Sequence, residues 1–259
     1  MKQLILLLFL ITGFTTWSQV PNYVPSDGLV GWWPFNGNAN DESGNGNNGT
    51  VIGATLTNDR FGNTNTAYAF NDNNNEYIEV MESATINNCV EMSVSFWFII
   101  DANNNYSHFV NKTDIPTGSP EPKQFVVALN DIGFYFYYDA INYFQSTIFP
   151  SLNEWHNFTV SYNFSPTIGT GECKFYLDGI EIANFPSTSA LNNTNFNMRF
   201  GSYADLIINT ISGKLDDIGI WNRALTECEI QDLYNAELNA PTVDLGDDQT
   251  ICSGDDLEL

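Results

Sequence analysis

Positively charged residues are scarce in this sequence. Eight Lys and Arg stand against 31 Asp and Glu, which gives a formal net charge of −23. Such a surface repels phosphate groups, so the composition argues against a nucleic-acid partner and against docking on anionic lipid. The excess of carboxylates is instead compatible with binding of divalent cations.

Histidine and long apolar runs are also scarce. With only two His, a multi-histidine metal site is almost excluded. The one long apolar run, residues 4–14, follows Met1, Lys2 and Gln3 and precedes small or polar residues. This order is typical of a secretory signal peptide, which we place at residues 1–18. We therefore expect a secreted or cell-surface protein without membrane insertion, because about 20 apolar residues are needed to span a bilayer. An N-terminal membrane anchor is the alternative.

Cysteine is limited to four positions, Cys89, Cys173, Cys228 and Cys252. Export permits disulfides, and four cysteines allow three complete pairings. Because the sequence has no CxxC motif and no Cys/His spacing, we do not expect a zinc site.

Hydrophobic residues make up 43% of the chain and aromatic residues 14%, enough for a sizeable core. Short alternating or apolar segments separated by polar turns predict strands, most clearly at residues 91–101. The other predicted strands are residues 29–35, 67–70, 77–80, 125–129, 132–138, 155–162, 173–177, 180–183, 196–201 and 214–221. Asp178-Gly179 predicts a hairpin turn. A single helix is expected at residues 226–235, with Thr226 as N-cap and Glu229 three residues on. This pattern predicts an all-β antiparallel sandwich with one short C-terminal helix.

Composition changes at both ends of this segment. Residues 19–26 form a short leader, and residues 236–241 (AELNAP) are typical of a linker. Residues 242–259 begin a new strand pattern and then stop. Eighteen residues cannot bury a core of their own. We therefore expect them to be the start of a truncated further domain.

Four segments carry a resemblance to a known family. They are GLVGWWPFNGNANDESGNGNNGT at 28–50, EWHNFTVSYN at 154–163, KFYLDGIEIA at 174–183 and GKLDDIGIWNRALTECEIQDLY at 213–234. Together they resemble bacterial LamG-like jelly-roll domains over residues 27–235. The resemblance implies a concanavalin A-like jelly-roll sandwich of two stacked antiparallel sheets. The tail DLGDDQTICSG, residues 244–254, resembles the start of an Ig-like or PKD-like repeat of bacterial surface proteins.

The resemblance does not decide whether the protein is an enzyme, because the superfamily includes lectins, adhesion modules and polysaccharide hydrolases or lyases. Its glucanases carry an E-x-D-x-x-E motif, which places alternate carboxylates on one face of a strand. This sequence has no such motif, and EYIE at 76–79 and DGIE at 178–181 do not fit. His156 is expected to be a packed structural residue, and His108 has no nucleophile signature nearby. We therefore expect no catalytic residue, with a hydrolase or lyase as the alternative.

The polar loop at residues 36–49 (NGNANDESGNGNNG) is rich in oxygen ligands suited to calcium. An EF-hand is rejected because Asp41 stands where that loop needs Gly. The resemblance implies a structural calcium between the first-strand region and an Asp of the last strand. Asp216 matches that position, with Asp217 as the adjacent alternative on the opposite face. We predict calcium with Asp41 and Asp216 as side-chain ligands; a solvated loop without an ion is the alternative.

Four aromatic residues are candidates for binding a sugar, because aromatic rings pack against the apolar faces of sugar rings. Trp97, Tyr135, Tyr137 and Tyr143 are placed on the solvent side of a concave sheet, and the Asn-rich loops 102–107 and 187–197 would line its rim. The alternative is that these rings are buried on the second face of inner strands. We expect a non-catalytic extracellular recognition module that binds polysaccharide or glycan. A protein-binding adhesion module is the other alternative.

The resemblance also implies a disulfide. In the family, the strand matching residues 91–100 lies antiparallel beside the strand matching 213–222, which would bring Cys89 within bridging distance of Cys228. Cys173 shares a face with core residues and is expected to be a buried free thiol. Cys252 is expected to pair beyond the given sequence. We therefore predict a Cys89–Cys228 disulfide.

Overall fold

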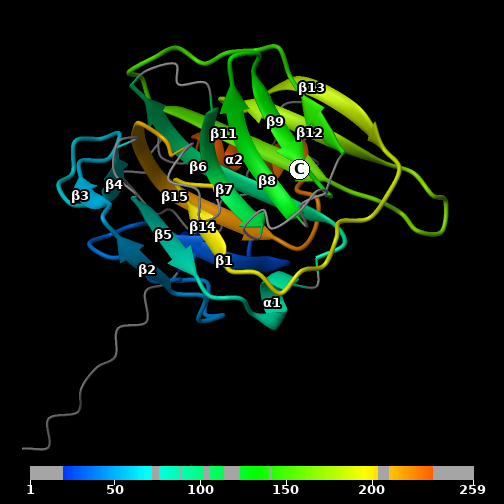
Figure 1. Ribbon diagram of the computed structural model, residues 1–259, viewed down its shortest axis with the longest axis horizontal. Coiled ribbons are helices and arrows are strands. Elements are labelled where there is room, and N and C mark those ends of the chain that lie inside the picture. The colour runs from blue at the N-terminus through cyan, green and yellow to red at the C-terminus, as the bar shows by residue number, and fades with distance from the viewer. Residues whose placement is uncertain are drawn as a thin grey trace, which may run out of the picture.

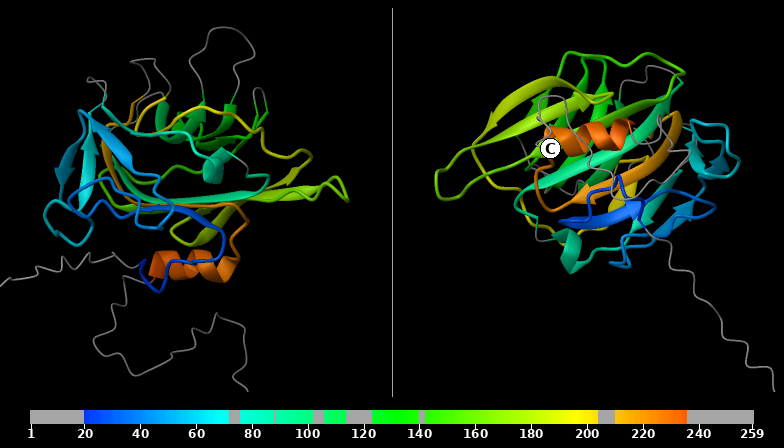
Figure 2. Two further views of the ribbon diagram at one scale, coloured as in Figure 1. Left: turned by 90° about the horizontal axis from the view of Figure 1, so that it is seen from below. Right: turned by 180° about the vertical axis from the view of Figure 1, so that it is seen from behind.

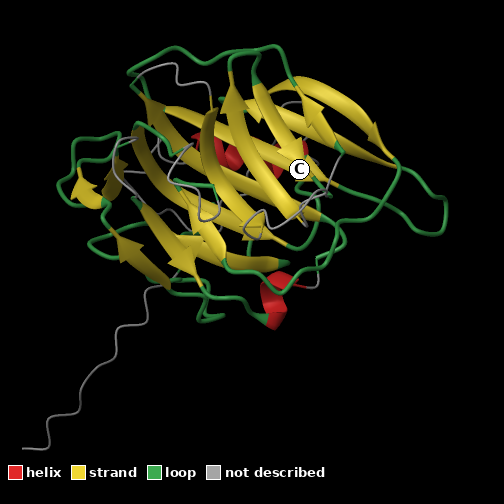
Figure 3. Cartoon of the chain, viewed as in Figure 1, coloured by secondary structure: helices red, strands yellow, loops and turns green. Residues whose placement is uncertain are grey.

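The computed structural model describes residues 20–71, 76–87, 89–101, 106–113, 123–139, 142–203 and 210–235. Within these ranges the chain forms two stacked β-sheets with the hydrophobic core between them (Figure 1, Figure 3). The strand pairings are antiparallel. The predicted jelly-roll sandwich is therefore confirmed.

One sheet has eight strands and the other has seven. The eight-stranded sheet has the order β13 (Ile180–Ser187), β12 (Gly171–Leu177), β11 (His156–Tyr162), β6 (Met92–Ile100), β15 (Gly213–Trp221), β4 (Ala67–Phe70) and β3 (Thr55–Thr57), with β1 (Leu29–Trp33) also paired to β15. The seven-stranded sheet has the order β10 (Tyr143–Gln145), β9 (Phe134–Tyr137), β8 (Lys123–Asn130), β7 (Tyr106–Thr113), β14 (Met198–Phe200), β5 (Tyr77–Val80) and β2 (Gly49–Ile52). The helices are α1 (Ala84–Asn87) and α2 (Glu227–Asn235). Neither described helix is long and apolar enough to cross a membrane.

Strand β6 lies at the centre of the eight-stranded sheet, between β11 and β15. The alternation predicted for it is confirmed. The five side chains that point into the core are 0–1% exposed, namely Met92, Val94, Phe96, Phe98 and Ile100. The opposite side of β6 is buried as well, because further elements cover the outer face of this sheet.

Helix α2 is one of those elements, and Figure 2 shows it against the outer side of the eight-stranded sheet. Its Ile230 and Leu233 pack against Trp32 and Trp221 of the sheet. The predicted capping pair is confirmed, because Thr226 N donates to Glu229 Oε2 at 2.8 Å and Glu229 N donates to Thr226 Oγ1 at 3.3 Å.

The predicted Cys89–Cys228 disulfide is wrong, because Cys89 is a buried free thiol. Strands β6 and β15 do pair antiparallel, with Ser93 opposite Trp221, as the prediction assumed. The flanking segments, however, leave the sheet on opposite sides. Cys89 packs in the core between the sheets, whereas Cys228 belongs to α2 on the outer face. Cys173 is a buried free thiol, as expected, and no disulfide joins two of the described residues.

Several elements of the structure were not predicted from the sequence. Strands β2, β3 and β10 and helix α1 are only three or four residues long, which is too short to show a period of two or of 3.6. In β7 a register shift between His108 and Val110 places both Phe109 and Val110 in the core. This bulge breaks the period of two that identifies a strand. The predicted segments 1–18, 236–241 and 242–259 lie outside the described residues.

A pair of stacked aromatic rings joins the two sheets across the core. Phe134 of β9 and Phe158 of β11 are fully buried and stacked, with ring centroids 4.1 Å apart. We expect Phe158→Ala to lower the free energy of unfolding by about 3–5 kcal/mol, because it leaves a cavity between the sheets. Urea unfolding measures this. The control is Ile180→Ala, a hairpin position 69% exposed, which should stay within about 0.5 kcal/mol of wild type. Equal losses in the two variants would contradict this packing.

Candidate functional site

The outer side of the seven-stranded sheet carries a group of aromatic side chains. In β9 the side chains of Phe134 and Phe136 point into the core. Tyr135 and Tyr137, which alternate with them, therefore point to the outer side. Tyr143 of β10 pairs directly with Tyr137. We call this group the tyrosine face, and it consists of Tyr106, His108, Tyr135, Tyr137, Tyr143 and Tyr203.

The rings of the tyrosine face form a continuous series of contacts. The centroids of Tyr143 and Tyr137 are 4.9 Å apart, and those of Tyr137 and Tyr135 are 5.7 Å apart. The Tyr135 hydroxyl is hydrogen bonded to His108 Nε2 at 3.0 Å, and the His108 ring lies 4.7 Å from that of Tyr203. Each ring is therefore held by its neighbours.

Exposure changes along this series. Tyr143 is 50% exposed, Tyr137 is half-buried, and Tyr135 is only 4% exposed. Tyr135 forms a buried cluster with Val126, Ala128 and Tyr203. Burial and the neighbouring tyrosines raise the pKa of Tyr135 far above its usual value, so its hydroxyl stays neutral. The buried rings thus fix the position of the exposed ones.

Polar groups border the tyrosine face on the β14 side. Asn111 of β7 donates from Nδ2 to Ser202 O at 2.9 Å. Its buried Oδ1 has no hydrogen-bond partner within the described part of the chain. Farther along the sheet, Arg199 pairs with Glu79 at 3.1 Å and its guanidinium lies 4.4 Å from the Tyr77 ring. The border therefore holds a charged pair and a buried amide that is closed off from solvent.

Trp97 does not belong to this face, which corrects the grouping that the sequence predicted. It lies in β6 of the other sheet and is 6% exposed. Its indole stacks on Tyr234 of α2 with centroids 5.7 Å apart, and the Arg60 guanidinium lies 4.3 Å from the ring. Tyr135, Tyr137 and Tyr143 do come together as predicted, whereas Trp97 is covered by the helix and a loop.

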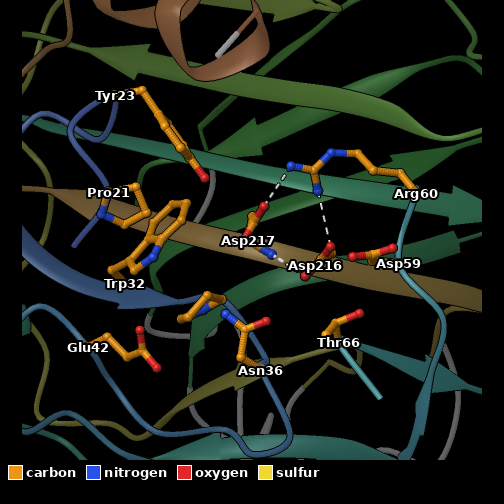
Figure 4. A pocket seen from close by; sticks show the side chains of 11 residues that line it. Pro21, Tyr23, Trp32, Asn36, Glu42, Asp59, Arg60, Thr66, Asp216 and Asp217 are labelled. Atoms are coloured by element: carbon orange, nitrogen blue, oxygen red, sulfur yellow. Dashed lines mark hydrogen bonds and ion pairs between the residues drawn. The ribbon is translucent and has the colours of Figure 1, made fainter. Parts of the chain in front are cut away.

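Asp216 and Asp217 lie at a bulge in β15 on the eight-stranded sheet, where the register shifts between Asp216 and Gly219. We expected neighbouring carboxylates to point to opposite faces. Instead Asp217 has a φ of 45°, and both carboxylates accept from Arg60, at 3.1 Å and 2.8 Å (Figure 4). Burial and the nearby Asp217 raise the pKa of Asp216, while Arg60 acts to lower it.

Asp41 is used by the loop that contains it. Its Oδ1 accepts from the backbone N–H groups of Trp32 at 3.0 Å and Ser43 at 2.9 Å. Its Oδ2 accepts from the backbone N–H of Asn47 at 2.8 Å. These bonds fold the polar loop back onto β1.

The described residues do not fit a calcium ion held by Asp41 and Asp216. Backbone N–H groups occupy both oxygens of Asp41, and Arg60 already neutralises Asp216. Within the described ranges, no group of three or more His, Cys, Asp or Glu is arranged to hold a metal ion. Calcium held by Asp41 and Asp216 therefore stays a prediction, and the hydrogen bonds and the ion pair of these two residues give it no support.

His156, at the start of β11, lies between a carboxylate and a hydroxyl group. Its Nδ1 lies 2.7 Å from Asp178 Oδ2, and its Nε2 lies 2.8 Å from Ser151 Oγ. This order of Ser, His and acid resembles a hydrolase triad. The Ser151 hydroxyl, however, donates to Glu154, and the hydrogen bond to Asp178 raises the pKa of His156. Because the Ser151 proton goes to Glu154, Ser151 does not donate it to His156 Nε2, so the contacts agree with the expected structural role.

Some residues of these sites escaped the sequence analysis. His108 and Tyr106 stand two positions apart, which is the spacing of one strand face, but the bulge that follows hid the strand. The composition could have pointed to Arg60 more readily than to His108, because Arg60 is one of only eight basic residues in the chain. In a strongly acidic protein, one of the few basic side chains is expected to pair with buried carboxylates, because an opposite charge stabilises their ionised form.

The comparisons with known proteins agree with this architecture. A family model described as the concanavalin A-like lectin/glucanases superfamily matches residues 72–231, which is more than half of the chain. No curated protein matches.

Three of the solved structures that resemble the chain illustrate the likeness. Domain 4 of AbnA, a GH43 extracellular arabinanase from Geobacillus stearothermophilus in complex with arabinotriose, has a TM-score of 0.63 at 17% identity, covering 80% of this chain and 98% of that one. The binding domain of Paraclostridial Mosquitocidal Protein 1 has a TM-score of 0.64 at 22% identity, covering 83% and 53%. Trypanosoma rangeli sialidase in complex with 2,3-difluorosialic acid has a TM-score of 0.63 at 14% identity, covering 85% and 34%. At these identities the likeness shows the fold alone.

The pKa of His156 predicts a pH dependence of stability. Because the folded state raises this pKa above its usual value of about 6.5, protonated His156 stabilises the fold below that pH. The contribution is lost as the pH rises through the folded-state pKa. Asp178→Asn removes the main cause of the shift and keeps a residue type that tolerates the positive φ of 52° at this position. Urea unfolding from pH 5.5 to pH 8.5 should therefore show a steeper fall for wild type than for the variant. Parallel curves would show that the contact with Asp178 has no such role.

Calcium should leave the melting temperature of the protein unchanged, because Asp41 and Asp216 are already bonded within the chain. The measurement is thermal unfolding in calcium chloride and in a chelator. A rise in melting temperature with calcium that Asp216→Asn abolishes would restore the predicted ion.

Proposed function

The chain belongs to the concanavalin A-like lectin/glucanases superfamily, and we propose that it is a carbohydrate-recognition module that binds glycan on the tyrosine face. One observation carries the proposal. Exposed Tyr143 and half-buried Tyr137 are held by a buried series of rings that ends at Tyr135 and His108. Such preorganisation reduces the entropy lost on binding.

The chemistry of this face suits a sugar. An exposed tyrosine ring offers an apolar surface for the C–H groups of a pyranose, and its hydroxyl offers a polar handle. Because the chain carries a net charge of −23, a neutral glycan is favoured over an acidic one. Arabinotriose is bound in the arabinanase structure, which supports the ligand class without identifying the ligand.

We propose binding without hydrolysis at this face. A glycosidase of the common type needs two carboxylates about 5–9.5 Å apart. The seven strands of this sheet contain a single acidic residue, Glu79. Arg199 holds it in an ion pair. The sheet therefore lacks the carboxylate pair that such a reaction requires.

We also propose that the module works outside the cell as part of a larger secreted or surface protein. The apolar run of residues 4–14 and the repeat-like tail at residues 242–259 support this placement. Protein-mediated adhesion is the alternative role, and it would use an apolar patch in place of a row of tyrosines.

Removing an exposed ring tests the binding surface. We expect Tyr143→Ala to weaken binding to the strongest ligand on a glycan array by about fivefold or more, since stacking on an exposed ring contributes on the order of 1 kcal/mol or more. Tyr143→Phe keeps the ring and should retain most of the affinity. The measurement is isothermal titration calorimetry with that glycan.

The matched control is Phe61→Ala, which removes a ring that is 48% exposed on a loop of the other sheet. It should leave glycan affinity unchanged. If Phe61→Ala weakens binding and Tyr143→Ala does not, the glycan binds elsewhere. Release of reducing ends from polysaccharide, lost when one carboxylate is replaced, would contradict the proposal of binding without hydrolysis.

A further inference from the structure

A separate polar pocket lies on the outer side of the eight-stranded sheet, beside the bulge of β15. Its volume is about 170 Å³. Figure 4 shows side chains from the N-terminal leader, from β1, from two loops and from β15 converging on it. The residues that matter for its chemistry are Tyr23, Trp32, Glu42, Asp59, Arg60 and the pair Asp216 and Asp217.

Trp32 brings an unused hydrogen-bond donor to this pocket. Its side chain is 2% exposed, and Nε1 has no partner within the described residues. The neighbouring tryptophans differ, because Trp33 Nε1 donates to Asn47 O at 2.9 Å and Trp221 Nε1 donates to Pro25 O at 2.7 Å. A buried N–H without a hydrogen-bond partner destabilises the folded state, because it has lost its bond to water. In Figure 4 the Trp32 indole lies in the pocket wall between Pro21 and Asp217, so a bound acceptor would remove this destabilisation.

The carboxylates around the pocket are already engaged in the fold. Asp59 accepts from the backbone N–H groups of Phe61 at 2.8 Å and Asn63 at 2.9 Å. Asp216 and Asp217 share Arg60. Each carboxylate oxygen can still accept a further hydrogen bond. The pocket therefore combines one unmet donor with several fixed acceptors.

This combination limits the class of ligand. Four acidic side chains against one arginine repel an anion. A bare cation cannot accept from Trp32 Nε1, and Arg60 already occupies the cation position between Asp216 and Asp217. A neutral hydroxyl group can bond both to the unmet donor and to the fixed acceptors, because its oxygen accepts and its hydrogen donates.

Size narrows the choice further. Pockets for drug-sized ligands have volumes of about 300–1,000 Å³, so 170 Å³ holds one sugar ring or a small polyol and not an oligosaccharide. The rings of Tyr23 and Trp32 supply apolar surface for the C–H groups of such a ligand.

We propose that this pocket binds a single neutral sugar ring or a small polyol, with Trp32 Nε1 donating to one of its hydroxyl oxygens. The pocket lies on the opposite sheet from the tyrosine face. The proposal therefore stands independently of the function proposed for that face.

The test uses the whole protein and five named probes, D-galactose, D-mannose, D-xylose, L-arabinose and glycerol, each titrated with detection by saturation-transfer NMR. At least one probe should bind. Trp32→Phe keeps the ring, removes the N–H group and should weaken that binding at least about tenfold. The titrations are repeated in Tyr143→Ala, which removes the contribution of the tyrosine face, and the binding that remains there is the part that Trp32→Phe should weaken.

Circular dichroism shows whether Trp32→Phe is folded. Where it is not, Glu42→Gln replaces it, because it removes a charged acceptor at the pocket with little change in shape, and it should weaken binding in the same direction. Binding by none of the five probes overturns the proposal, as does equal binding to wild type and the folded variant. Loss of binding in Tyr143→Ala, or displacement of the probe by calcium chloride alone, overturns it as well.

Discussion

In a chain with eight basic residues, Arg60 places its guanidinium between two carboxylates of β15 and the ring of Trp97. This contact ties the loop after β3 to the central strands of the eight-stranded sheet. Trp97 in turn stacks on Tyr234, so the same contact positions helix α2. The contact forms part of the wall of the polar pocket, and it adds to the packing of Ile230 and Leu233 that holds the helix on the sheet.

The physical constraint behind this contact is the cost of a buried charge. Carboxylates at a bulge between sheet and helix need a cation, and removing one partner of such a buried pair typically costs about 3–5 kcal/mol. The superfamily resemblance implied that calcium would meet this need near Asp216. Arg60 meets it from within the chain. Neutralisation by a side chain needs no ion from the medium, and it holds Asp217 in the same arrangement.

The fold follows from local patterns in the sequence more completely than the sites do. Three predicted features depend only on residues that are near neighbours in the sequence, and the structure contains all three. They are the alternation along β6, the Asp178-Gly179 turn and the Thr226–Glu229 cap. Trp97 shows where this reasoning stops. Its strand and face were predictable, but the element that covers that face depends on packing between distant segments. The bulges in β7 and β15 likewise change which side chains share a face. A bulge interrupts the period of two, so the sequence pattern cannot predict where it lies.

The two outer surfaces of the sandwich differ in kind. Helix and leader cover the eight-stranded sheet and leave a small polar pocket, whereas the seven-stranded sheet presents a row of tyrosines. The most direct test of a carbohydrate-recognition role is a crystal structure of the protein with the glycan that binds it most strongly. The account predicts a sugar ring stacked on Tyr137 or Tyr143. A glycan bound to neither ring, at the edges of the sandwich or on a surface loop, would contradict it.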